Sequence, residues 1–331
     1  MNLDARQARR EAARRRTRRQ RRAAVAALAA ALLLLTVGAF AMGGAGGLSL
    51  RGDGEADRSA SAAAQKQPPA PPQLPRGGRE IFPRYRVVGF YGAPQAAELG
   101  ILGIGTPTRA ARRLRTQAAA YRRGGRPVMP ALELISTIVN STPGADGKYR
   151  TRQKRRVIRR YLKAARRARA LLVLDIQPGR ADFMDEVRAL RPYLEQPDVS
   201  LALDPEWSMR PGQVPGQAIG STTADKVNEV SAYLARTVKR RNLPQKLLLV
   251  HQFTDDMITD KKRLRRRPGI ALTLNVDGIG DRPNKIGKYK SFTDSRRFHY
   301  GFKLFYKEDV NLMRPRDVLR LRPKPDLVMY E

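Results

Sequence analysis

Eight short apolar runs, each separated from the next by a longer stretch, constrain the fold of this chain more than any other feature. Runs of this length predict strands. The stretches between them include arginine-rich amphipathic segments at 108–123, 151–168, 181–194 and 223–240. These segments predict helices, and the alternation indicates parallel strands joined by crossover helices. The expected strands cover 85–91, 127–134, 170–176, 199–204, 246–253, 270–276, 300–306 and 326–330.

Eight strand-helix units in about 250 residues match a (β/α)₈ TIM-like barrel, an α/β fold, and this is the architecture we expect. Several runs carry small or branched residues at alternate positions, as a closed ring requires on its inside. The pairs are Val87 and Gly89, Ser200 and Ala202, and Ala271 and Thr273. A doubly wound open sheet is the alternative, but the segment 89–92 lacks the glycine spacing of a dinucleotide-binding loop. Because the last run ends the chain, we expect no eighth helix.

The first 42 residues have a different composition. Residues 1–22 carry ten arginines against Asp4 and Glu11, and residues 23–42 carry no charge. Such an apolar run can cross a bilayer core of ~30 Å, and the positive-inside rule keeps the arginines in the cytoplasm. We therefore expect a single-pass transmembrane helix or signal anchor at 23–42 in the cell membrane, with the rest of the chain extracytoplasmic. Cleavage after Ala39-Phe40-Ala41 is the alternative.

Residues 43–80 consist largely of Gly, Ala, Ser, Gln and Pro, which predicts a disordered linker between the membrane segment and a folded domain at 81–331. The chain contains no cysteine, which excludes disulfides, thiol nucleophiles and thiolate metal sites.

The net charge of +35 bears on binding partners. Either the arginines form a solvated basic surface, or they attach the domain to an anionic envelope polymer or lipid headgroups. The sequence shows no nucleic-acid recognition motif and no interleaving of aromatic and basic residues. We therefore do not expect nucleic acid as a partner.

Polar residues, most of them acidic, follow the expected strands. Barrel enzymes carry their reacting groups at the carboxyl ends of the strands, so these residues predict a site there. An aspartate after a strand can also cap the next helix. That explanation suits Asp255 better than Glu133, which a loop is expected to follow. The candidate substrate-binding residues are Tyr91, Glu133, Gln177, Trp207, His251, Gln252, Asn275 and Asp277, and Glu331 closes the last run.

The sharpest cluster is LALDPEWSM at 201–209. With a period of two, Asp204 and Glu206 share a face, and neighbouring carboxylates raise one another's pKa, so one can remain protonated as an acid. Trp207 beside them could serve as a platform for a sugar ring. A structural turn with solvated acids is the alternative. The candidate catalytic residues are Glu206, Asp204 and Asp175.

We expect no cofactor and no metal. The chain has two histidines, and His299 begins a run whereas His251 ends one, so a zinc site is not expected. A carboxylate site for Ca²⁺ or Mg²⁺ built from Asp175, Asp204 and Asp277 is the alternative.

Asp204-x-Glu206 at the end of a fourth strand is similar to the end of the DxxDxDxE motif of chitinase-like glycoside hydrolases. The resemblance implies that Glu206 is the acid and that Asp204 orients the substrate. It covers one strand only, because 199–202 reads VSLA instead of the earlier aspartates and Pro205 occupies the intervening position. The chain also resembles an uncharacterised family of exported actinobacterial proteins, which implies no particular activity. That resemblance rests on GRPVMPALELI, LLVLDIQPGRADF, LDPEW, PGQVPGQAIG, VHQFTDDMI and LNVDGIGD.

Two functions follow from these residues. One is a membrane-anchored glycoside hydrolase-like protein that acts on envelope or extracellular polysaccharide by carboxylate acid/base catalysis. The other is a non-catalytic barrel that binds glycan or envelope polymer with the same residues. They differ in whether two carboxyl groups converge across one pocket, so the sequence leaves open whether the protein is an enzyme.

Overall fold

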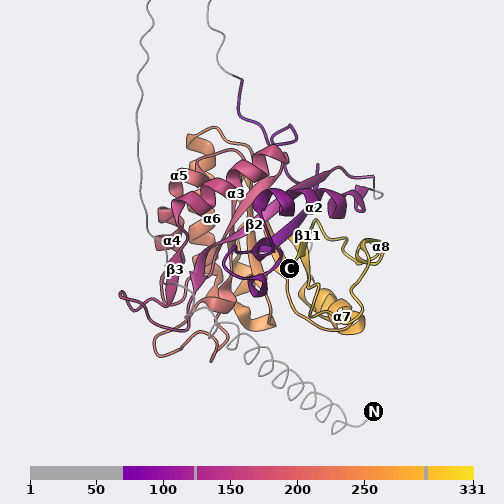
Figure 1. The fold of residues 1–331 in the computed structure, drawn as a ribbon. Coiled ribbons are helices and arrows are strands. Elements are labelled where there is room, and N and C mark those ends of the chain that lie inside the picture. The colour runs from indigo at the N-terminus through magenta and orange to yellow at the C-terminus, as the bar shows by residue number, and fades with distance from the viewer. Residues whose placement is uncertain (1–69, 123–124, 294–296) are drawn as a thin grey trace, which may run out of the picture.

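Eight parallel strands close into a barrel in this computed structural model, which describes residues 70–122, 125–293 and 297–331 (Figure 1). Closure is shown by β1, which pairs with β2 on one side and with β11 on the other. The barrel expected from the sequence is thereby confirmed, and the open sheet is excluded. The strands are β1 (Arg86–Gly92), β2 (Val128–Val139), β4 (Leu171–Ile176), β5 (Val199–Leu203), β7 (Lys246–Gln252), β9 (Ile270–Val276), β10 (His299–Leu304) and β11 (Leu327–Tyr330).

Helices cover the outside of the barrel, with α3 to α6 on the left of Figure 1 and α7 and α8 on the right. The helix layer is incomplete, because residues 253–269 between β7 and β9 form two 3₁₀ turns and the short strand β8 (Ile258–Thr259) but no α-helix. The α-helices described are α2 (Pro107–Ala119), α3 (Arg155–Arg167), α4 (Phe183–Ala189), α5 (Arg191–Leu194), α6 (Ala224–Arg240), α7 (Arg282–Phe292) and α8 (Pro315–Val318).

One helix prediction needs correction. The stretch 181–194 is not one helix, because it divides at Leu190 into α4 and α5. Pro192 lies in the first turn of α5, where its missing N–H costs least, whereas inside a continuous helix it would remove a hydrogen bond. Helix α7 lies between two expected strands, where the strand-helix alternation predicts a crossover helix, although its segment was not singled out in the sequence. It begins at an N-cap, Asp281, whose side chain accepts a hydrogen bond from the Asn284 N–H.

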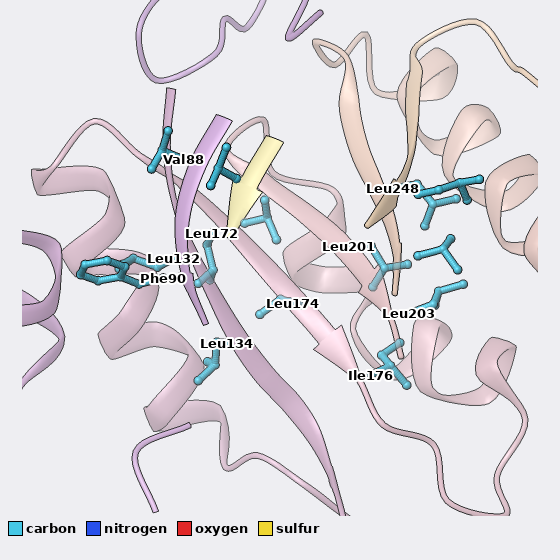
Figure 2. Packing of buried hydrophobic residues seen from close by; sticks show 14 of the residues in the cluster. Val88, Phe90, Leu132, Leu134, Leu172, Leu174, Ile176, Leu201, Leu203 and Leu248 are labelled. Carbon is cyan, nitrogen blue, oxygen red and sulfur yellow. The ribbon is translucent and has the colours of Figure 1, made fainter. Parts of the chain in front are cut away.

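Side chains alternate between the inside and the outside of the barrel. Figure 2 shows outward-facing residues of neighbouring strands, including Val88, Phe90 and Leu172, in the apolar layer between strands and helices. Their inward neighbours form a second cluster that includes Val87, Met129 and Val173. The inside is filled closely: a Cβ added at Gly89 would lie 2.6 Å from the Cε of Met329. This explains the small residues expected at alternate positions.

β2 is longer than expected and continues past the barrel to Val139, where it pairs antiparallel with β3 (Arg150–Arg152). This hairpin is attached to α4 by Glu186, which is fully buried. Its carboxylate lies 2.8 Å from Nε of Arg150 and 2.7 Å from Nε of Arg152. The parallel pair β6 (Thr222–Thr223) and β8 joins two further loops outside the barrel.

The amino-terminal end of the barrel is closed by residues 74–85. Leu74, Ile81, Phe82 and Tyr85 are buried against the inward residues of the strands. Residues 70–80, which composition placed in the linker, therefore include packed residues. Arg79 helps to hold them, because its guanidinium donates to the carbonyl of Leu243 at 3.0 Å.

The expected membrane segment, residues 23–42, lies outside the described residues. Within the described ranges, no helix is both long enough and apolar enough to cross a bilayer.

Candidate functional site

Each of the eight strands contributes a polar residue to the carboxyl-terminal mouth of the barrel. The cause is the period of two: in β4, Leu171 and Val173 face inward, so Asp175 also faces inward, one step nearer the mouth. The register of the paired strands places these residues at similar heights along the barrel axis. For example, Tyr91 of β1 lies opposite Glu133 of β2, and His251 of β7 lies opposite Asn275 of β9. The residues are Tyr91, Glu133, Asp175, Asp204, His251, Asn275, Lys303 and Glu331.

His251 joins two carboxylates at this mouth. Its Nδ1 lies 2.8 Å from Oδ2 of Asp277, and its Nε2 lies 2.9 Å from Oε1 of Glu133. Burial alone would lower the pKa of His251, but Asp277 and Glu133 raise it well above its ordinary value. Because each ring nitrogen faces a carboxylate oxygen, the protonated form of the ring is favoured.

Lys303 is the second cation of the mouth, and the sequence analysis missed it. It is only 4% exposed. Its Nζ lies 2.7 Å from Oε2 of Glu331, 3.4 Å from Oδ2 of Asp277, and 3.8 Å from the ring centroid of Tyr91. Burial opposes the charge, but Asp277 and Glu331 raise the pKa of Lys303 well above its usual value. A lone lysine inside the run YGFKLFY was the available signal, since a buried lysine needs acidic partners.

The carboxyl groups of the mouth outnumber its two cations, and they divide into two kinds. Burial raises the pKa of Asp175 and, helped by Asp277, that of Glu206 to about 7 in each case. Burial also raises the pKa of Asp204 well above its normal range. Asp277 is the opposite case, because Lys303 and His251 outweigh burial and lower its pKa to about 2. Protonated and ionised carboxyl groups therefore coexist near neutral pH.

Glu206 is more exposed than most acids of the mouth, and it shares this partial exposure with Glu331. Glu206 is half-buried and forms no ion pair with any described residue, whereas Glu133, Asp175, Asp204 and Asp277 are buried. The expected shared strand face with Asp204 is wrong, because β5 ends at Leu203 and 205–207 form a 3₁₀ turn. Pro205 at the start of this turn has no N–H to continue the ladder. The two carboxyl groups still interact, since Glu206 contributes to the raised pKa of Asp204.

The remaining candidates have mainly positioning contacts. Gln177 accepts from the Val139 N–H at 3.2 Å and donates to the Tyr91 hydroxyl at 3.1 Å, which in turn donates to Oδ2 of Asp175. Asn275 donates to Oδ1 of Asp277. Trp207 is 7% exposed, so little of its ring is open as a platform for a sugar, contrary to our expectation.

Four buried acceptor oxygens at the carboxyl-terminal end of the barrel have no hydrogen-bond donor among the described residues. They are Oε2 of Glu133, Oδ1 of Asp175, Oδ1 of Asn275 and Oε1 of Gln252. The first three residues face inward, whereas Gln252 follows the inward-facing His251 in β7 and therefore faces outward. Because buried polar atoms are nearly always paired, such acceptors suit a ligand rich in hydroxyl donors.

Glu133, Asp175 and His251 also form a trio that could hold a divalent cation, with ligand atoms all within 4.8 Å of one another. A cation there would have to displace the Nε2 proton that His251 shares with Glu133. Within the described ranges, the alternative set of Asp175, Asp204 and Asp277 does not converge in this way.

Fold and site thus define a closed parallel α/β barrel with an acidic carboxyl-terminal mouth. No family model matches the chain, and no curated protein does. A solved GH18 chitinase from Pseudoalteromonas aurantia is similar in structure, with 10% sequence identity and a TM-score of 0.35, over 74% of this chain and 93% of that chain. This is a weak chitinase-like resemblance, too distant to support an argument. The barrel assignment therefore rests on the strand pairing.

Proposed function

We propose that this protein is a membrane-anchored, extracytoplasmic glycoside hydrolase that cleaves an envelope or extracellular polysaccharide. One observation carries the proposal: the half-buried Glu206 has its pKa raised to about 7, and the neighbouring Asp277 has its pKa held at about 2. Two carboxyl groups whose environments separate their pKa values in this way suit the acid and the charged partner of glycoside hydrolysis.

In the proposed reaction, Glu206 gives its proton to the glycosidic oxygen as the bond from that oxygen to the anomeric carbon breaks. Asp277 remains ionised and stabilises the positive charge that develops on the sugar. Water then forms the new bond to the anomeric carbon and gives a proton to the Glu206 carboxylate, which restores the acid. His251 and Lys303 hold Asp277 in its ionised form through contacts of 2.8 Å and 3.4 Å. Asp204 and Asp175 lie deeper, where their protonated forms limit the negative charge around Glu206.

Sugar hydroxyls fit the acceptors of the mouth. Oε2 of Glu133, Oδ1 of Asp175 and Oδ1 of Asn275 can each accept a hydrogen bond, and a polyhydroxylated ring supplies several donors. We propose these three residues as substrate contacts, with Tyr91 and Gln177 holding Asp175 in place.

The test is Glu206→Gln, assayed for reducing ends released from a panel of polysaccharides. We expect turnover to fall by about 10²–10⁴-fold, because the amide keeps the shape but has no proton to give, and binding to persist. Wild-type activity should also decline as the pH rises through about 7, where Glu206 loses its proton. Glu229→Gln, on the exposed face of α6, is the matched control. Cleavage by Glu206→Gln at the wild-type rate would refute the assignment.

A non-catalytic glycan-binding barrel is the second candidate, and the internal pairing of the mouth favours it. Glu133, His251, Asp277, Lys303 and Glu331 form one continuous chain of ion pairs. In that case wild type and Glu206→Gln would bind a polysaccharide equally, and neither would release reducing ends from it.

A further inference from the structure

A cavity lies at the amino-terminal end of the barrel, opposite the mouth. Its volume is about 550 Å³, and its lining includes Tyr85, the residues 125–128 at the start of β2, and Arg169, which precedes β4. None of the polar residues of the mouth contributes to it. Five arginines line it: Arg76, Arg84, Arg122, Arg126 and Arg169.

These arginines have little countercharge. Asp326 lies 2.5 Å from Nη1 of Arg126, but it is shared with His299 at 2.7 Å. Of the other four arginines, none forms an ion pair with an acidic side chain in the described part of the chain. The crowding is visible at Arg76, because burial first, then Arg122 and Arg169, lower its pKa.

Several guanidinium donors here are also buried and unpaired. Nε and Nη2 of Arg126 have no hydrogen-bond partner among the described residues. Nη1 of the adjacent Arg86 has none either, although this residue is only 3% exposed and its Nε donates to the Pro325 carbonyl. Arg76, Arg84 and Arg169 each donate from Nε to a neighbouring carbonyl or hydroxyl oxygen. Because buried donors without acceptors are costly, the unpaired donors of Arg126 and Arg86 show that this region has fewer acceptor oxygens and less negative charge than its guanidinium groups require.

We propose that this cavity binds a phosphate group. A phosphate supplies up to two negative charges and several acceptor oxygens, and planar guanidinium groups bind it through paired hydrogen bonds. A single carboxylate would leave most of the arginines uncompensated.

The phosphate belongs either to a lipid headgroup or to a soluble phosphate compound. Arg76 lies in the segment through which the chain reaches the barrel, on the side of the expected membrane anchor. The proposal does not depend on the hydrolase activity.

The experiment uses the full chain and the double variant Arg76→Gln, Arg122→Gln. Arg156→Gln with Arg236→Gln, on exposed faces of α3 and α6, removes the same charge elsewhere and is the matched control. Two probes at constant ionic strength distinguish a soluble phosphate compound from a lipid headgroup. Binding of inorganic phosphate is measured by calorimetry. Binding of phosphatidylglycerol vesicles, compared with phosphatidylcholine vesicles, is measured by co-sedimentation. A thermal unfolding curve for each variant confirms that it is folded.

We expect the double variant to bind at least about tenfold more weakly than the control, because two charged hydrogen-bonding groups are lost. If the wild type binds inorganic phosphate and the double variant binds it more weakly by this factor, the site is supported and a soluble phosphate suffices. If the wild type binds phosphatidylglycerol vesicles but not inorganic phosphate, and the double variant binds the vesicles more weakly by the same factor, the site is supported and its ligand is a lipid headgroup. If the control variant loses as much affinity as the double variant, or if neither probe binds the wild type, the proposal is overturned.

Discussion

Asp175 shows how a single buried group can govern the response of the fold to pH. Its side chain is fully buried, and its pKa is raised from 3.8 to about 7, mainly by burial. The folded state therefore holds this proton more tightly than the unfolded chain. The stability it contributes is complete below pH 4 and is lost progressively as the pH rises to about 7.

We predict that Asp175→Asn weakens this pH dependence. Between pH 5 and pH 7 the free energy of unfolding of the wild type should fall. The fall for the variant should be smaller by up to about 3 kcal/mol, since one pKa unit corresponds to ~1.4 kcal/mol. Denaturant unfolding at several pH values measures the difference. Asp185→Asn, exposed on α4, should follow the wild type. Equal slopes for Asp175→Asn and wild type would show that Asp175 does not hold its proton in this range.

Lys303 illustrates the residue-scale knowledge that a sequence does not provide. The residues on either side of Lys303 are apolar. The alternation of side chains along a strand identifies Lys303 as inward-facing. Its partners Asp277 and Glu331 lie on two other elements, so only the closed barrel shows that it neutralises them. The same holds for His251, whose position at a strand end was evident but whose two carboxylate partners were not.

At the scale of elements, the hairpin of β2 and β3 depends on one buried acid of α4. The Glu186 carboxylate forms ion pairs with Arg150 and Arg152 and accepts a hydrogen bond from the Thr137 hydroxyl. We predict that Glu186→Gln lowers the free energy of unfolding by about 2 kcal/mol, because hydrogen bonds to charged groups are weakened. Hydrogen exchange should speed up at the amides of 150–152. Asp185→Asn again serves as the control, since its pair with Arg188 is exposed. Unchanged exchange in β3 would mean that backbone pairing alone holds the hairpin.

The elements themselves were predictable to different degrees. All eight barrel strands follow from local apolar runs, because a parallel strand buried on both faces must be apolar almost throughout. The polar ring at the mouth follows from the same alternation. In contrast, the extension of β2, the strand β3 and the break between α4 and α5 depend on tertiary pairing, such as that of Arg150 with Glu186. The buried position of Trp207 likewise depends on how the loop after β5 folds back.

For the whole molecule, the two ends of the barrel carry opposite charge. The mouth gathers six carboxyl groups around His251 and Lys303, whereas the amino-terminal cavity gathers five arginines around Asp326. The described chain begins at the basic end, where Leu74 and Arg79 pack. A membrane anchor preceding residue 70 would therefore tether the barrel by its basic end. The mouth, at the opposite end of the barrel axis, would be free to meet a polymer.

The anchor itself can be tested on cells. We predict that the full chain sediments with membranes and that protease added outside intact cells digests the barrel, because residues 1–22 are strongly basic and 23–42 are uncharged. Leu33→Arg with Leu34→Arg should move the protein out of the membrane fraction, since each central arginine costs about 2.5–3.5 kcal/mol on insertion. Leu48→Arg with Leu50→Arg, just beyond the apolar run, is the matched control and should sediment like the wild type. Recovery of a soluble chain that starts near Met42 would instead show that the segment is a cleaved signal peptide and that the barrel is released.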